Sequence, residues 1–131
     1  MIRVQVHALT DVGQKRKMNE DSHAWWIPEK PEDLARRGVL LVVADGMGGA
    51  RAGERASRLA VDTVLSHYTA PVPDGAAAGP AFEDTQPAPG IKVAPAAGPA
   101  PALLRLKESV ELANKAIHDE SSHDPALTGM G

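Results

Sequence analysis

Two short acidic motifs contain the side chains best suited to chemistry. Asn19-Glu20-Asp21 precedes a predicted strand, and Asp45-Gly46 follows an apolar run that ends at Ala44. Carboxylates beside free loop carbonyls are the ligands that hard cations such as Mg²⁺ and Mn²⁺ prefer, and glycine at position 46 allows the backbone to approach an ion closely. Taken alone, each motif is also explained by a solvated turn or a helix-capping turn.

A basic triplet, Lys15-Arg16-Lys17, stands just before the first acidic motif. A run of charges is usually a solvated loop. Arg16, however, lies four residues before Glu20, and Gly13 permits a turn that would bring its guanidinium over a nearby metal site. A guanidinium in that place would bind phosphate oxygens in a bidentate manner.

The composition limits the possible function classes. Cysteine is absent, so a metal site must use oxygen or imidazole ligands, and the five histidines show no ligand cluster. The formal net charge of −3 and the aromatic content of 3% argue against nucleic-acid binding. The longest apolar run, residues 39–44, is far shorter than the ~20 residues that span a bilayer. We therefore expect a cytoplasmic protein without a membrane segment.

Secondary-structure patterns place the motifs at the ends of strands. Alternation over residues 2–8 predicts a half-buried strand, and a second strand is expected over residues 22–27. Residues 38–44 are short, β-branched and apolar throughout, which predicts a strand buried on both faces. A helix is expected from Gly53 to Tyr68, and another over residues 102–124.

The helices show amphipathic patterns, and a different composition separates them. The apolar side of the first helix comprises Ala56, Leu59, Ala60, Thr63, Val64 and His67, and that of the second comprises Leu103, Leu106, Val110, Ala113 and Ile117. From residue 71 to 101, 21 of 31 positions are Pro, Gly or Ala. Such a stretch buries too little apolar surface to offset its ordering entropy, so residues 70–101 are expected to be a flexible insertion.

Three motifs together resemble a known family. Residues 10–21 resemble the opening motif of the metal-dependent protein phosphatases, the PPM or type 2C serine/threonine phosphatases. Residues 41–49, followed by 53–57, resemble the second motif in its bacterial form, and residues 127–131 resemble the start of a third. The order and spacing match across residues 1–69 and 102–131, which makes the signal stronger than any one short pattern.

The resemblance implies a fold, a reaction and a set of site residues. The fold is α+β, a four-layer αββα sandwich that is incomplete in this chain. The reaction is hydrolysis of phosphoserine or phosphothreonine by a water that two Mn²⁺ or Mg²⁺ ions activate. The implied roles are bridging of the ions by Asp45, metal ligation by the Gly46 carbonyl and by Glu20 (directly or through water), orientation of water by Asp21, and clamping of the substrate phosphate by Arg16.

Two departures from the family pattern affect the expected activity. Met47 stands where some members have a histidine as candidate general acid. The family also has metal-binding aspartates downstream of the motif at residues 127–131. We therefore expect residues 1–131 to be the N-terminal part of a phosphatase domain, with little or no activity by itself.

The implied partners are a phosphorylated protein substrate and a cognate serine/threonine kinase. Two other functions stay open. In the first, the chain is a non-catalytic fragment that binds metal or phosphate. In the second, it is an interaction fragment in which the Ala- and Pro-rich segment contacts the partner.

Overall fold

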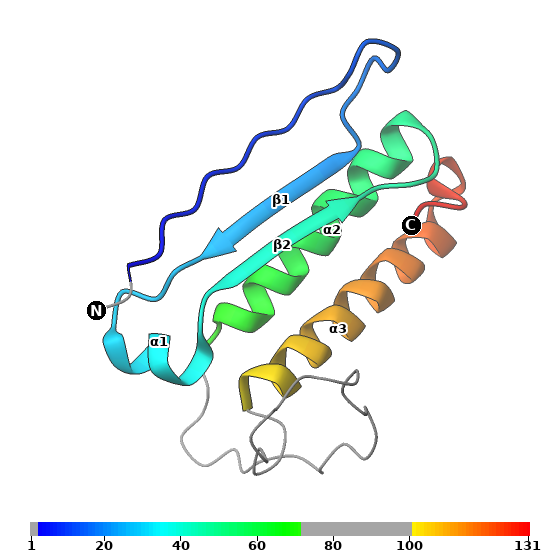
Figure 1. The fold of residues 1–131 in the computed structure, drawn as a ribbon. Coiled ribbons are helices and arrows are strands. Elements are labelled where there is room, and N and C mark those ends of the chain that lie inside the picture. Colours follow the sequence, from blue (N-terminus) through cyan, green and yellow to red (C-terminus); the bar gives the residue numbers. More distant parts are fainter. Residues whose placement is uncertain (1–2, 72–100) are drawn as a thin grey trace, which may run out of the picture.

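The computed structural model describes residues 3–71 and 101–131. In chain order these form strand β1 (Asp21–Trp26), helix α1 (Pro31–Arg37), strand β2 (Leu40–Asp45) and helices α2 (Ala50–Thr69) and α3 (Pro101–His123), shown in Figure 1. A short 3₁₀ turn, η1 (Pro125–Leu127), follows. Most of the predicted insertion at residues 70–101 lies outside the described residues.

The strands form a small antiparallel sheet. The register pairs Asp21 with Asp45 at one end and Trp26 with Leu40 at the other. Helix α2 contacts both strands, and α3 packs against α2 (Figure 1). The mixed architecture is compatible with the predicted α+β class. The described residues contain one sheet, and they do not show the second sheet of the predicted four-layer sandwich.

Two apolar clusters hold these layers together. The larger joins β2, α2 and α3, and the smaller joins the start of α2 to the C-terminal segment. The buried members are Leu40, Val64, Tyr68 and Ala113 in the first cluster, and Ala52, Ala56 and Met130 in the second.

The prediction that β2 is buried on both faces is wrong for the described part of the chain. Exposure alternates along the strand: Leu40 is buried, whereas Leu41 is 62% and Val43 is 82% exposed. Helix α2 covers one face of the sheet. Residues 3–71 and 101–131 supply no layer on the other face, and odd-numbered side chains of β2 therefore reach solvent.

The predicted first strand is also not observed in its described part. Residues 3–10 have no regular secondary structure, with Val4 39% and Leu9 98% exposed. Alternation becomes a stable strand only where a neighbour completes the hydrogen-bond ladder and an apolar surface receives alternate side chains. Within the described residues the segment runs beside β1 (Figure 1) but forms no such ladder with it.

The prediction for α2 holds except at its start, and α1 was missed. Helix α2 begins three residues before the predicted Gly53 and ends one residue after Tyr68. Helix α1 has a proline at its start, acidic residues in its first turn, arginines in its last and Gly38 at its C-terminus. These are standard start and stop signals, and they identify a helix too short to show apolar periodicity.

The predicted apolar side of α3 is partly wrong. Leu103 and Val110 are exposed, and the buried positions are Ser109 and Ala113. Polar contacts with α2 explain why α3 turns a different side toward the core from the one predicted. The Arg105 guanidinium donates hydrogen bonds of 2.7–3.0 Å to the carbonyls of residues 67, 68 and 70 at the end of α2. The Ser109 hydroxyl lies 2.9 Å from Nδ1 of His67.

A bidentate ion pair joins the other ends of α2 and α3. Arg55 Nε and Nη2 donate to the two carboxylate oxygens of Glu120 at 2.5 and 3.0 Å. The hydrogen bond with Glu120, reinforced by its charge, raises the pKa of Arg55 above its usual range. None of the helices in the described ranges is long and apolar enough to cross a membrane.

Candidate functional site

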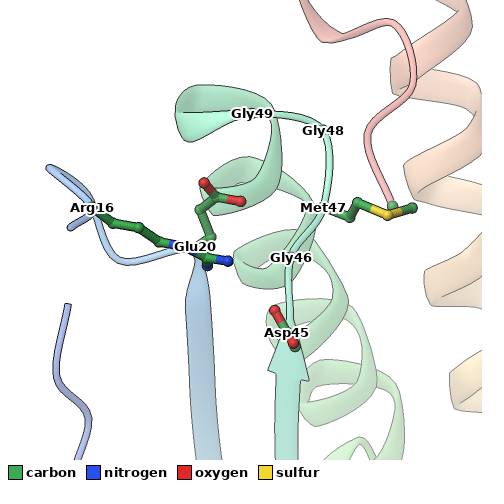
Figure 2. A pocket seen from close by; sticks show the side chains of 8 residues that line it. Arg16, Glu20, Asp45, Gly46, Met47, Gly48 and Gly49 are labelled. Atoms are coloured by element: carbon green, nitrogen blue, oxygen red, sulfur yellow. The ribbon is translucent and has the colours of Figure 1, made fainter. Parts of the chain in front are cut away.

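A pocket lies where β2 ends, next to the start of α2 (Figure 2). It joins side chains from the loop before β1, the tip of β2 and the glycine-rich loop that leads into α2. The lining residues are Arg16, Glu20, Asp45, Gly46, Met47, Gly48, Gly49 and Gly131. Four of the five predicted site residues therefore line one pocket, although they come from separate parts of the sequence.

Glu20 and Gly46 are tied together through the backbone. The amide of Gly46 donates a hydrogen bond of 3.1 Å to the carbonyl oxygen of Glu20. This bond lies directly beyond the last register pair of the sheet and extends the pairing by one residue on each strand. The carboxylate-bearing residue before β1 is thereby placed next to Asp45.

Gly46 also packs directly on α2. A Cβ at this position would overlap the carbonyl oxygen of Gly53 and would lie 2.5 Å from the carbonyl carbon of that residue. It would also lie 2.7 Å from the carbonyl oxygen of Glu20. Only glycine allows the loop after β2 to approach the helix this closely. The sequence predicted a close approach at this position, but to an ion rather than to a helix.

The C-terminal segment holds the glycine-rich loop from its other side. The amide of Met47 donates to the Gly131 carbonyl at 2.6 Å, and the amide of Gly131 donates back to the Met47 carbonyl at 2.9 Å. A Cβ on Gly48 would lie 2.8 Å from Cα of Met130, whose side chain is buried. The third motif therefore supports the loop of the second.

Arg16 reaches the pocket from an exposed turn. Gly13 has a φ of 73°, and its amide donates to Oδ1 of Asp11 at 2.6 Å. Asn19 closes the turn, since its side-chain amide donates to the Thr10 hydroxyl at 2.6 Å. Figure 2 shows the Arg16 side chain directed toward Glu20. Arg16 makes no ion pair or hydrogen bond with the described residues, so its donors are available.

Asp21 is placed apart from the other four predicted residues. It does not line this pocket. It lines a second hollow with residues 7–10, 22–23 and Val43. In the sheet register it stands directly opposite Asp45, where two like charges repel each other. A cation beside the pair would offset that repulsion.

The donor types fit a hard divalent cation, but their number is small. Glu20 and Asp45 contribute carboxylates to the pocket, and the backbone of Gly46 lies beside them. Oxygen donors of this kind suit Mg²⁺ or Mn²⁺. Among residues 3–71 and 101–131, however, no group of three or more histidine or acidic side chains is arranged to hold a metal. The two carboxylates of this pocket are therefore not part of a larger group of such side chains in the described residues.

Part of the chain is similar in sequence to a known enzyme. The chain is 43% identical over 58 residues to protein phosphatase PhpP of Streptococcus pneumoniae serotype 2 (strain D39), and the same values hold for PhpP of strain R6. The match covers 44% of this chain and 21% of the relative, so the chain matches about a fifth of the relative's length. No family model matches the chain. Part of this chain is thus similar to a protein phosphatase.

Proposed function

We propose that the chain is part of a metal-dependent protein phosphatase of the PPM family that hydrolyses phosphoserine and phosphothreonine. The observation that carries the proposal is the pocket in which Arg16, Glu20, Asp45 and Gly46 meet. Similarity to a protein phosphatase over 58 residues supports the same reaction class. The four-layer αββα sandwich is part of this proposal.

In this proposal, the acidic and basic residues of the pocket have different roles in phosphate hydrolysis. Glu20 and Asp45 would hold a pair of divalent cations with the Gly46 carbonyl, and Asp21 would orient water from beside Asp45. The cations, when bound, supply Lewis-acid activation of water and neutralise phosphate charge. The guanidinium of Arg16 binds the phosphate of the substrate and thereby orients the ester in the pocket. A cognate kinase that supplies the phosphoprotein stays a prediction.

One observation favours a second candidate function. The described residues lack a group of three acidic or histidine ligands, so a cation held by Glu20 and Asp45 would have few protein ligands. In this alternative, the site binds cations and phosphate but does not hydrolyse the phosphate ester. The alternative is therefore a non-catalytic metal- or phosphate-binding fragment, which turnover by the chain would exclude.

The test uses the full 131-residue chain with Mn²⁺ and inorganic phosphate as probes. We expect calorimetry to detect Mn²⁺ binding that weakens at least tenfold in Asp45→Asn and in Glu20→Gln, because each change removes one anionic ligand. Arg16→Ala should keep Mn²⁺ binding and weaken phosphate binding in the presence of Mn²⁺. Turnover of p-nitrophenyl phosphate and of a phosphothreonine peptide, measured in parallel, assigns catalysis.

Asp62→Asn is the matched control, since Asp62 is an exposed carboxylate in the middle of α2. It should bind Mn²⁺ like the parent chain. Equal Mn²⁺ affinity in the parent, Asp45→Asn and Glu20→Gln would contradict the cation site. Because residues 1–131 by themselves are expected to have little or no activity, binding of both probes without turnover fits either function, whereas turnover that is lost in Asp45→Asn would exclude the non-catalytic alternative.

A further inference from the structure

The side chain of Glu20 lies against the backbone of Gly53 in α2. A Cβ built on Gly53 would overlap Oε2 of Glu20 and would lie 2.9 Å from Cδ and 3.1 Å from Cγ. The three nearest atoms to this Cβ position all belong to the Glu20 side chain. Real Cβ atoms keep larger distances, so any residue other than glycine at position 53 must displace this side chain.

The backbone conformation does not explain a glycine at this position. Gly53 lies in the fourth position of a 20-residue helix, and it is not among the glycines with positive φ. Glycine in a helix interior is destabilising relative to alanine, because the unfolded chain has more freedom to lose. The space that Glu20 occupies is the reason in this structure for the absence of a side chain.

Glu20 is thus held at two points. Its carbonyl oxygen accepts the hydrogen bond from Gly46, which fixes the main chain. Its side chain lies on Gly53, which limits the directions that the carboxylate can take. Figure 2 shows this carboxylate beside the first turns of α2, close to the glycine-rich loop. The same helical backbone contacts Gly46 through the Gly53 carbonyl, so a single residue of α2 contacts both acidic motifs.

We propose that Gly53 is a positioning residue, which sets the direction of the Glu20 carboxylate in the pocket by leaving it space against α2. This inference rests on the proposed function, because it assigns to Glu20 a role as a cation ligand. Gly53 itself contacts neither the cation nor the substrate phosphate in this account. It acts only through Glu20.

The experiment combines Gly53→Ala and Glu20→Ala in a double-mutant cycle on the full chain. Thermal unfolding without metal is the first readout. In the parent background, Gly53→Ala should lower the melting temperature, because the new methyl group collides with Glu20. In the Glu20→Ala background, the same substitution should raise the melting temperature, since alanine favours the helix and the collision is gone. This second background is the matched control.

Mn²⁺ titration by calorimetry is the second readout, with circular dichroism to verify the fold. Gly53→Ala should weaken Mn²⁺ binding at least tenfold with unchanged helix content, a change that a purely structural role would not produce. An equal shift of melting temperature in both backgrounds, or parent-like Mn²⁺ affinity in Gly53→Ala, would overturn the inference. If the parent chain binds no Mn²⁺, the proposed function and the positioning role fail together, and the cycle then reports only on the contact between the two residues.

Discussion

At the scale of single residues, the candidate site depends on glycines as much as on charged groups. Arg16, Glu20 and Asp45 line one pocket, and Gly46 and Gly53 allow the loop after β2 and the Glu20 side chain to lie unusually close to α2. The charged groups carry the proposed metal and phosphate contacts. The absent side chains set the distances between the elements that carry these groups.

Gly46→Ala should destabilise the fold by about 1–3 kcal/mol, because the added methyl group overlaps backbone atoms that cannot rotate away. Urea denaturation followed by circular dichroism measures this change. Gly131→Ala is the control, since its Cβ would meet only Cε of Met47 at 3.9 Å and should change the free energy of unfolding by less than about 0.5 kcal/mol. Equal stability of the two variants would contradict the close packing of the loop on α2.

Residue types, spacing and family resemblance were enough to select residues that the structure brings together, but not every neighbour of these residues. Arg16, Glu20, Asp45 and Gly46 were predicted from charge, spacing and family resemblance, and they line one pocket. Gly53 was predicted as the start of the helix and as part of the second motif, but its contact with Glu20 was not predicted, because a glycine in a helical pattern gives no sign of what packs against it. Its contact with Glu20 depends on how β1 and α2 pack, which the pattern of neither segment contains.

At the scale of elements, the C-terminal end of α2 is held by two arginines from other elements. Arg105 of α3 donates to carbonyls of the last turn, and Arg37 of α1 approaches the carbonyls of residues 69 and 70 at 3.5 Å. The Arg37 guanidinium also lies 4.6 Å from the ring centroid of Trp26, and the Tyr68 hydroxyl donates to its carbonyl. Positive groups at this end satisfy free carbonyls and complement the helix dipole.

Arg105→Met should lower the free energy of unfolding by about 1–3 kcal/mol, because half-buried carbonyls of α2 lose charged donors while the aliphatic packing is kept. Arg36→Met on the exposed side of α1 is the control and should be close to neutral. Chemical denaturation of both variants under the same conditions decides the point. A neutral Arg105→Met would mean that water replaces the guanidinium at no cost.

The limits of periodicity are clearest in α3. The predicted bounds, 102–124, differ from the observed Pro101–His123 by one residue at each end, because a long amphipathic pattern defines a helix well. The predicted inner side failed at Leu103 and Val110, since Arg105 and Ser109 turn toward α2 to bond with its end. Polar partners on another helix decide the rotation, and they are invisible in the pattern of α3 alone.

At the scale of the whole molecule, α2 and α3 form one unit although 31 residues separate Thr69 from Pro101. Residues Ala70 and Arg105 are in direct hydrogen-bond contact, so the segment between them begins and ends at the same end of the helix pair (Figure 1). The ion pair of Arg55 and Glu120 joins the helices at the other end. The contacts between α2 and α3 therefore bridge a long gap in the sequence.

Replacement of residues 72–100 by an eight-residue Gly-Ser linker should preserve the fold and stabilise it by about 1 kcal/mol, because a shorter loop costs less entropy to close. Thermal unfolding measures the effect, which corresponds to a rise of several degrees for a domain of this size. A 29-residue Gly-Ser linker is the control that separates length from composition. Loss of the α2–α3 contacts in both variants would show that the replaced residues contribute contacts of their own.

The two tryptophans of the chain stand next to each other in β1 and face opposite sides of the sheet. Trp26 packs against the larger apolar cluster, edge to face with Tyr68, whereas Trp25 is 44% exposed beside His23 and Leu41 on the uncovered side. The strand thus contains one indole that senses the interior and one that senses solvent. Emission from a Trp26→Phe variant would shift to the blue when a ligand or partner shields the outer surface, giving this small protein an intrinsic optical reporter of what docks there.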